Sequence, residues 1–170
     1  MKNIKLISAA LIIILIVPII IACGNQPAEG ANFNFDLKYG VGAKNEIDTF
    51  HGKFTKDMVD APSITITLKL SEAEMEEIYQ KMLDIDFFNY PDTFTVIPGP
   101  NEATQLVTPV NSYYFTVEKN GQTKTLSWED SNQNPNTKAD KLRELIVMIQ
   151  RMIEAKEEYK ELPDPGHAYL

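Results

Sequence analysis

Hydrophobic and polar residues alternate in several short stretches of the chain, which is the period-two pattern of half-buried β-strands. The clearest stretches are 33–39, where four apolar residues alternate with three polar ones, and 64–70, which follows Pro62. A less regular stretch over 46–55 carries Phe50 and Phe54 on one face, and it predicts a further strand.

Asn120 and Gly121 predict the turn of a β-hairpin, because this pair suits the type I′ turn that joins two adjacent strands. With these two residues in the turn, Phe115 lies opposite Leu126, which gives the hairpin one apolar face. The opposite face is predicted to consist of Tyr114, Thr116, Glu118, Thr123, Thr125 and Ser127.

Apolar residues at helical spacing predict two amphipathic helices. The first begins after Ser71, which forms a capping-box pattern with Glu74, and it ends near Asp86. The second is expected over 137–159, with Pro163 closing it. Together the elements predict an α+β fold: a two-layer sandwich with a mainly antiparallel five-stranded sheet and two amphipathic helices on one face.

The N-terminal segment has the pattern of a bacterial export signal. Two lysines precede a run of 17 uncharged residues, 6–22, which ends at the only cysteine of the chain, Cys23. A cysteine directly after a small residue, Ala22, resembles the lipobox, where a lipoprotein signal is cut and the cysteine is lipidated. An uncleaved membrane anchor is the alternative, but 17 residues are few for a bilayer core of about 30 Å, and Pro18 would kink the helix.

This pattern divides the chain into three predicted segments: a lipoprotein signal peptide over 1–22, the lipidated Cys23 with a flexible tether over 23–31, and a single α+β domain over 32–170. Lipidation would supply two acyl chains, which is what stable anchoring requires. We therefore expect a chain that contacts the membrane through Cys23 and lies on the extracytoplasmic face of the cell membrane.

The order of elements carries a resemblance to known proteins. Residues 70–75 open the first helix, Asp86-Phe87-Phe88 end it, and residues 120–125 form the late hairpin turn. This arrangement resembles a family of uncharacterised small lipoproteins from Gram-positive, Bacillus-type bacteria, and more distantly a wider family of secreted bacterial domains. The resemblance covers roughly residues 33–162. It implies a fold and a compartment, and it implies neither an activity nor catalytic residues.

The charge of the chain argues against nucleic acid as a partner. The sequence has 16 Lys and Arg against 24 Asp and Glu, a formal net charge of −8. Proteins that bind nucleic acid usually present a basic face. A single cysteine also excludes an intrachain disulfide framework and any site with several thiolate ligands.

Catalytic and metal-binding patterns are scarce in the sequence. HExxH, a glycine-flanked serine and a phosphate-binding glycine loop are absent. His51 is interpreted as an exposed strand residue and His167 as part of an exposed tail. Residues 130–134 imitate the start of a calcium loop, but Pro135 replaces the required glycine, so a polar turn is predicted instead. We therefore expect no catalytic residue, metal or cofactor.

Two surfaces remain as candidate binding sites. Residues 90–111 form the longest irregular stretch, and long loops in compact domains are often functional. The polar face of the hairpin is the second surface. The alternative for the loop is that it packs over the core. The alternative for the hairpin face is that it is simply the solvent-exposed side of an antiparallel sheet. The candidate binding residues are Phe94, Val96 and Ile97 in the loop and Tyr114, Thr116 and Thr125 on the hairpin.

These observations favour a non-catalytic binding or accessory module that contacts another envelope protein or a small ligand. An inhibitor or immunity lipoprotein would be a special case of such a module. The alternative from a different class is an envelope hydrolase, which would need two carboxyl groups with separated pKa values in one site.

Overall fold

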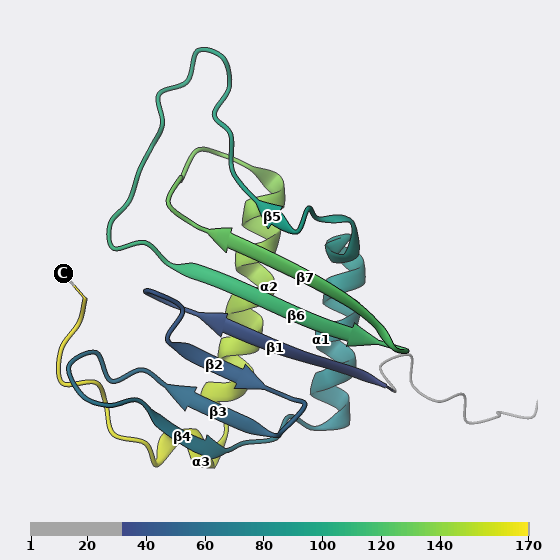
Figure 1. Cartoon of the computed structure of the whole chain (residues 1–170), viewed down its shortest axis with the longest axis vertical. Helices are drawn as coiled ribbons and strands as arrows, with labels where there is room; N and C mark the ends of the chain where they lie inside the picture. Colours follow the sequence, from purple (N-terminus) through teal and green to yellow (C-terminus); the bar gives the residue numbers. More distant parts are fainter. Residues whose placement is uncertain (1–31, 170) are drawn as a thin grey trace, which may run out of the picture.

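The computed structural model describes residues 32–169 as one open sheet with helices on one side of it (Figure 1). The strands run in the spatial order β4-β3-β2-β1-β6-β7-β5. Neighbours are antiparallel except β5, which pairs with β7 in parallel. The strands are β1 (Phe33–Tyr39), β2 (Asn45–Asp48), β3 (Lys53–Lys56), β4 (Ile64–Thr67), β5 (Thr93–Phe94), β6 (Ser112–Lys119) and β7 (Gln122–Glu129).

The helices are α1 (Glu72–Asp84), the short 3-10 helix η1 (Phe87–Asn89), α2 (Thr137–Glu154) and α3 (Glu157–Lys160). Figure 1 shows α1 and α2 together behind the sheet. The sheet side chains facing these helices are buried, and the largest fully buried ones include Trp128, Phe35, Phe54 and Phe115, which pack with Phe87 of η1 in one core. Within residues 32–169 no helix lies over the opposite face of the sheet, so the α+β class and the two layers that the sequence predicts are confirmed.

The late hairpin has the predicted register. Phe115 pairs with Leu126 and Tyr113 with Trp128, around the turn at Asn120 and Gly121. Both turn residues have positive φ, at 51° and 76°, as a type I′ turn requires.

The sheet has seven strands where five were predicted, because the stretch over 46–55 is two strands and because β5, which was not predicted, pairs with β7. The backbone reverses between Asp48 and Lys53, with Gly52 at a φ of +62°. Asp48 fixes the turn, since its Oδ1 accepts a hydrogen bond from the backbone N–H of His51 at 3.1 Å. The prediction that Phe50 and His51 are strand residues is therefore wrong. Phe50 lies in the turn with 39% of its surface exposed.

The capping box of α1 is present: Ser71 Oγ accepts from Glu74 N at 3.3 Å, and Glu74 Oε2 accepts from Ser71 N at 2.7 Å. The second helix ends five residues earlier than the predicted Tyr159, because Lys156 takes an extended conformation with ψ at 142°. Lys156 Nζ lies 2.6 Å from Glu74 Oε2, an ion pair that holds this break against the start of α1.

The predicted signal peptide over 1–22 and the predicted tether over 23–31, with Cys23, lie outside the described residues. Within residues 32–169, no helix combines the length and the apolar character needed to cross a bilayer.

Candidate binding surfaces

The long loop leaves the sheet after β5 and projects beyond it before it returns at β6 (Figure 1). Its first apolar residues point inward: Phe94 and Val96 are only 7% and 5% exposed. The Phe94 ring packs edge-on against Trp128, with centroids 5.4 Å apart. Ile97 and Leu106, in contrast, are 81% and 70% exposed. A partner that meets this loop would therefore contact Ile97 and Leu106, whereas Phe94 and Val96 belong to the core.

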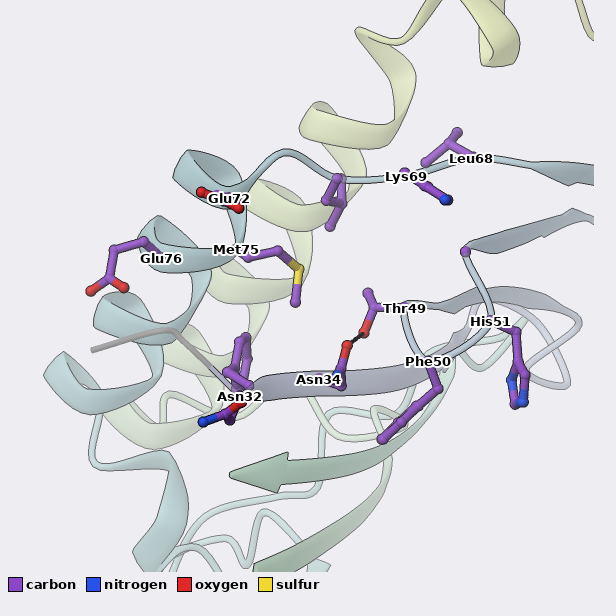
Figure 2. Close-up of a pocket in the computed structure, with 13 residues that line it drawn as sticks. Asn32, Asn34, Thr49, Phe50, His51, Leu68, Lys69, Glu72, Met75 and Glu76 are labelled. Atoms are coloured by element: carbon purple, nitrogen blue, oxygen red, sulfur yellow. Dashed lines mark hydrogen bonds between the residues drawn. The ribbon is translucent and has the colours of Figure 1, made fainter. Parts of the chain in front are cut away.

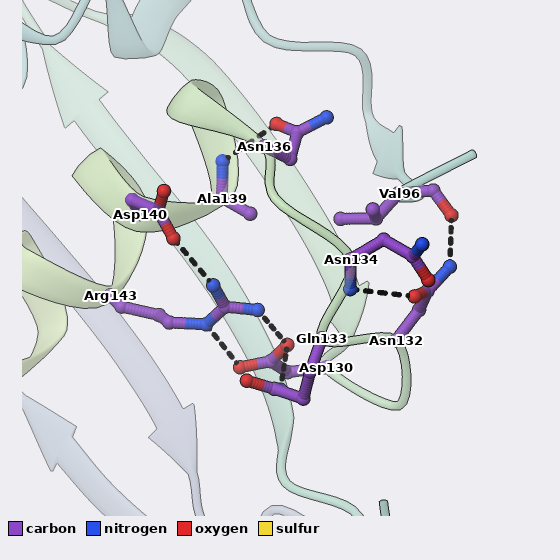
Figure 3. Close-up of polar contacts among 9 residues, drawn as sticks. All are labelled: Val96, Asp130, Asn132, Gln133, Asn134, Asn136, Ala139, Asp140 and Arg143. Carbon is purple, nitrogen blue, oxygen red and sulfur yellow. Dashed lines mark hydrogen bonds and ion pairs between the residues drawn. The ribbon is translucent and has the colours of Figure 1, made fainter. Parts of the chain in front are cut away.

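Two buried asparagines from the segment after β7 fix the legs of this loop (Figure 3). Asn132 Nδ2 donates to the carbonyl of Val96 at 3.0 Å. Asn134 Nδ2 donates to the carbonyl of Ala103 at 3.0 Å, and its Oδ1 accepts from Gln105 N at 2.9 Å. Asn132 and Asn134 are 8% and 3% exposed, and the bond from Asn132 to Val96 is buried. We call Asn132 and Asn134 the asparagine clamp.

The clamp belongs to a segment that is itself tied to α2. The Asp130 carboxylate receives two hydrogen bonds from Arg143, from Nε at 2.8 Å and from Nη2 at 2.6 Å. Asn136 caps α2 by accepting from Ala139 N at 3.0 Å. Residues 130–134, predicted as a polar turn that caps this helix, form an irregular segment instead, and the cap is Asn136, just beyond them. Within residues 32–169, no group of three or more His, Cys, Asp or Glu residues is placed to hold a metal ion.

The uncovered face of the sheet carries the second set of predicted residues. Thr116 pairs directly with Thr125, and Tyr114 lies on the same face with 45% of its surface exposed. The structure thus brings Tyr114, Thr116 and Thr125 together, while Ile97 lies in the loop that follows β5.

Three carboxylates on this face were not anticipated from the sequence. Asp36 on β1 lies opposite Asp48 on β2, and Glu46 is also on β2. Burial, with a hydrogen bond and repulsion from Glu46, raises the pKa of Asp36 to about 6. Burial alone would raise the pKa of Asp48. Hydrogen bonds from the ring and the backbone of His51 outweigh this effect, and the pKa of Asp48 is lowered. Two facing carboxyl groups therefore titrate in different ranges.

The register between β1 and β2 is what creates this arrangement. The alternation in 33–39 places Asp36 on the polar face of its strand. The partner of Asp36 could not be found from the sequence because 46–55 was interpreted as one strand. The turn from Asp48 to Gly52 is the feature that divides this stretch into two strands and places Asp48 opposite Asp36.

A cleft of about 690 Å³ opens at the end of the sheet where β1 begins, between the β2–β3 turn and the start of α1 (Figure 2). Phe33, Leu68 and Met75 contribute apolar surface, and polar residues surround them. Among the described lining residues Thr49 has the only hydroxyl group, and it donates to the carbonyl of Phe35 at 2.8 Å. The Thr49 hydroxyl is thus bonded to the backbone of β1.

Each of the two histidines lies beside a carboxylate. His51 Nδ1 lies 2.6 Å from Asp48 Oδ2, and Figure 2 shows its ring pointing away from Met75. His167 Nδ1 lies 2.6 Å from Asp60 Oδ2, with both side chains mostly exposed. The latter contact fastens the C-terminal segment to the β3–β4 connection.

Compared with known proteins, the chain matches no protein-family model and no curated protein.

Proposed function

We propose that this protein is a lipid-anchored binding module on the outer face of the cell membrane, and that it contacts another envelope protein through the loop over 95–107. The observation that supports the contact is a fixed loop with Ile97 and Leu106 exposed at its surface. Because the asparagine clamp holds both legs in advance, little conformational entropy is lost when the loop binds.

The composition of the loop favours a protein over a lipid surface. Residues 95–111 contain no Lys or Arg and one acidic residue, Glu102. Attraction to anionic lipids depends on basic residues near the surface. The exposed aliphatic side chains of Ile97 and Leu106 fit an apolar recess on a partner protein, which can cover their area.

The lipid anchor is supported by the sequence pattern that ends at Cys23. Its test is metabolic labelling with a fatty-acid probe in the native host. The wild-type chain should take up the label and stay with the membrane fraction, and Cys23→Ala should do neither. Equal labelling of both chains would refute lipidation at Cys23.

The contact is tested by a photo-reactive residue at position 97 in intact cells. We expect a discrete cross-linked protein from this position and none from Val147, a matched aliphatic residue on α2 with 40% exposure. The double change Ile97→Ser and Leu106→Ser should weaken capture at least tenfold. It should leave thermal unfolding unchanged, because both side chains already face water. Equal capture from positions 97 and 147 would refute the contact.

An envelope hydrolase is the second candidate, and the opposite pKa shifts of Asp36 and Asp48 favour it. Hydrolysis by two carboxyl groups needs one that is protonated and one that is ionised. The test is release of soluble fragments from envelope glycan by wild type, Asp36→Asn and Asp48→Asn. If the wild-type chain releases fragments, and both Asp36→Asn and Asp48→Asn abolish this release, the result would support a hydrolase over a purely binding role.

A further inference from the structure

The C-terminal segment over 163–169 lies on the surface of the domain and follows α3. Figure 1 shows it in yellow, passing the connection between β3 and β4. Leu162, just before it, packs against the core, but residues 163–168 are all exposed and Tyr169 is half-buried. A segment with so few buried apolar side chains opens locally at low cost. We call residues 163–169 the strap.

The strap is bonded to two charged residues that have little exposed surface. Lys56 and Asp57, where β3 ends, are 6% and 7% exposed. Lys56 Nζ donates to the carbonyl of Pro163 at 2.9 Å. The Tyr169 hydroxyl donates to Asp57 Oδ2 and accepts from Lys44 Nζ at 2.8 Å. Both buried charges therefore have a partner on the strap.

An unusual turn lies directly after these two residues. Val59 has a φ of +62°, which is rare for a β-branched residue. Across it, Asp60 N donates to the carbonyl of Met58 at 2.8 Å, so Val59 is the centre of a γ-turn of the strained kind. Asp57 Oδ1 accepts from Val59 N at 3.0 Å. Backbone strain of this kind persists only where the surrounding contacts impose it.

The strap supplies contacts on both sides of the strained turn. Tyr169 is bonded to one oxygen of Asp57, and the other oxygen of this carboxylate holds Val59 N. On the other side of the turn, His167 Nδ1 lies 2.6 Å from Asp60 Oδ2. If the strap leaves, both carboxylates lose these partners, and the turn loses contacts that oppose its relaxation.

We propose that the strap is a releasable conformational device with a closed and an open state. When closed, it holds the connection between β3 and β4 in the strained turn at Val59. When open, it lets this turn relax and uncovers the side chains of Lys56 and Asp57. Because the turn relaxes only in the open state, the strain at Val59 favours opening.

The strap does not depend on the proposed partner contact. None of its hydrogen bonds and ion pairs described above involves residues 95–107. Opening of the strap and partner binding through Ile97 are therefore separate properties, and each can fail without the other.

The state of the strap can be measured at Lys56. Its side chain is 8% exposed and is bonded to the strap, so an amine-acetylating reagent should reach it only when the strap opens. Lys53 is an exposed residue of the same strand and is the internal control. The ratio of the two acetylation rates, measured by mass spectrometry on the full chain, then reports the open fraction.

Relief of the strain should keep the strap closed. Glycine adopts positive φ without steric cost, and asparagine adopts it more readily than valine. Val59→Gly and Val59→Asn should therefore lower the rate at Lys56 at least threefold relative to Lys53. Asn120→Gly, which changes a residue with a φ of 51° in the hairpin turn, is the matched control and should leave the ratio unchanged. A ratio that neither change of Val59 lowers would overturn the coupling between turn and strap.

Loss of a strap contact should have the opposite effect. Tyr169→Phe keeps the ring and removes the hydroxyl that donates to Asp57, so it should raise the ratio at least threefold. Tyr114→Phe, at an exposed tyrosine of the sheet, is the control and should not change it. Circular dichroism of both variants should match that of wild type, because the opening is local. A ratio in Tyr169→Phe equal to that of wild type would refute the strap as a releasable device.

Discussion

Removing one side of the asparagine clamp should lower the free energy of unfolding by more than the loss of one polar side chain usually does. In Asn132→Ala, the Val96 carbonyl loses a donor at 3.0 Å, and Asn134 N loses the Asn132 Oδ1 acceptor at 3.0 Å. Both groups belong to residues that are 5% exposed or less. A buried polar group left without its partner costs about 1–3 kcal/mol. The expected loss is therefore about 2–5 kcal/mol, a large part of the roughly 5–15 kcal/mol that stabilises a typical domain.

The assay is urea unfolding followed by the fluorescence of Trp128, the only tryptophan and 2% exposed. Asn89→Ala is the matched control, because Asn89 Nδ2 donates to Asp86 Oδ1 at an exposed site. The control should change the free energy of unfolding by less than about 0.5 kcal/mol. Hydrogen exchange should also show faster opening of the loop near Val96 in Asn132→Ala. Equal unfolding curves for the two variants would contradict the clamp as a source of stability.

Two further predictions concern ionised groups. The pKa of Asp36 is raised from 3.8 to about 6, chiefly by burial and then by Glu46, so the folded protein holds this proton more tightly than the unfolded chain. This group therefore lowers stability as pH rises from about 4 to about 6, and Asp36→Asn should flatten that part of a melting-temperature profile against pH. A profile as steep as that of wild type would contradict this reasoning. Arg143→Ala leaves the carboxylate of Asp130, 7% exposed, without its guanidinium partner, and should cost about 3 kcal/mol in urea unfolding. Arg143→Lys should lie between that variant and wild type, and no loss in either would mean that the pair is not stabilising.

The sequence alone determined the elements whose signals are local. Asn120 and Gly121 specify the turn type, and alternation on either side then leaves one register that buries Phe115 and Leu126 together. Ser71 and Glu74 mark the start of α1 because their hydrogen bonds span only three residues. Such features depend on neighbours along the chain, and the tertiary structure retains them.

Local signals were insufficient where a turn interrupts a stretch that still reads as a strand. Phe50 and Phe54 have the spacing of one face, yet the side chain of Asp48 and the positive φ of Gly52 reverse the backbone between them. Likewise β5 has only two residues, Thr93 and Phe94, and it becomes a strand by pairing with β7. A pattern of two residues is too short to predict without its partner.

The candidate surfaces depend on contacts between distant segments, and only the tertiary structure decided them. Asn132 lies 36 residues from Val96, and nothing in the intervening sequence indicates that its amide binds that carbonyl. Phe94, Val96 and Ile97 are alike in hydrophobicity, but the packing against Trp128 and this clamp bury the first two and leave Ile97 in water. Composition therefore determined that the loop is apolar. The long-range hydrogen bonds and core contacts determined which of its side chains remains exposed.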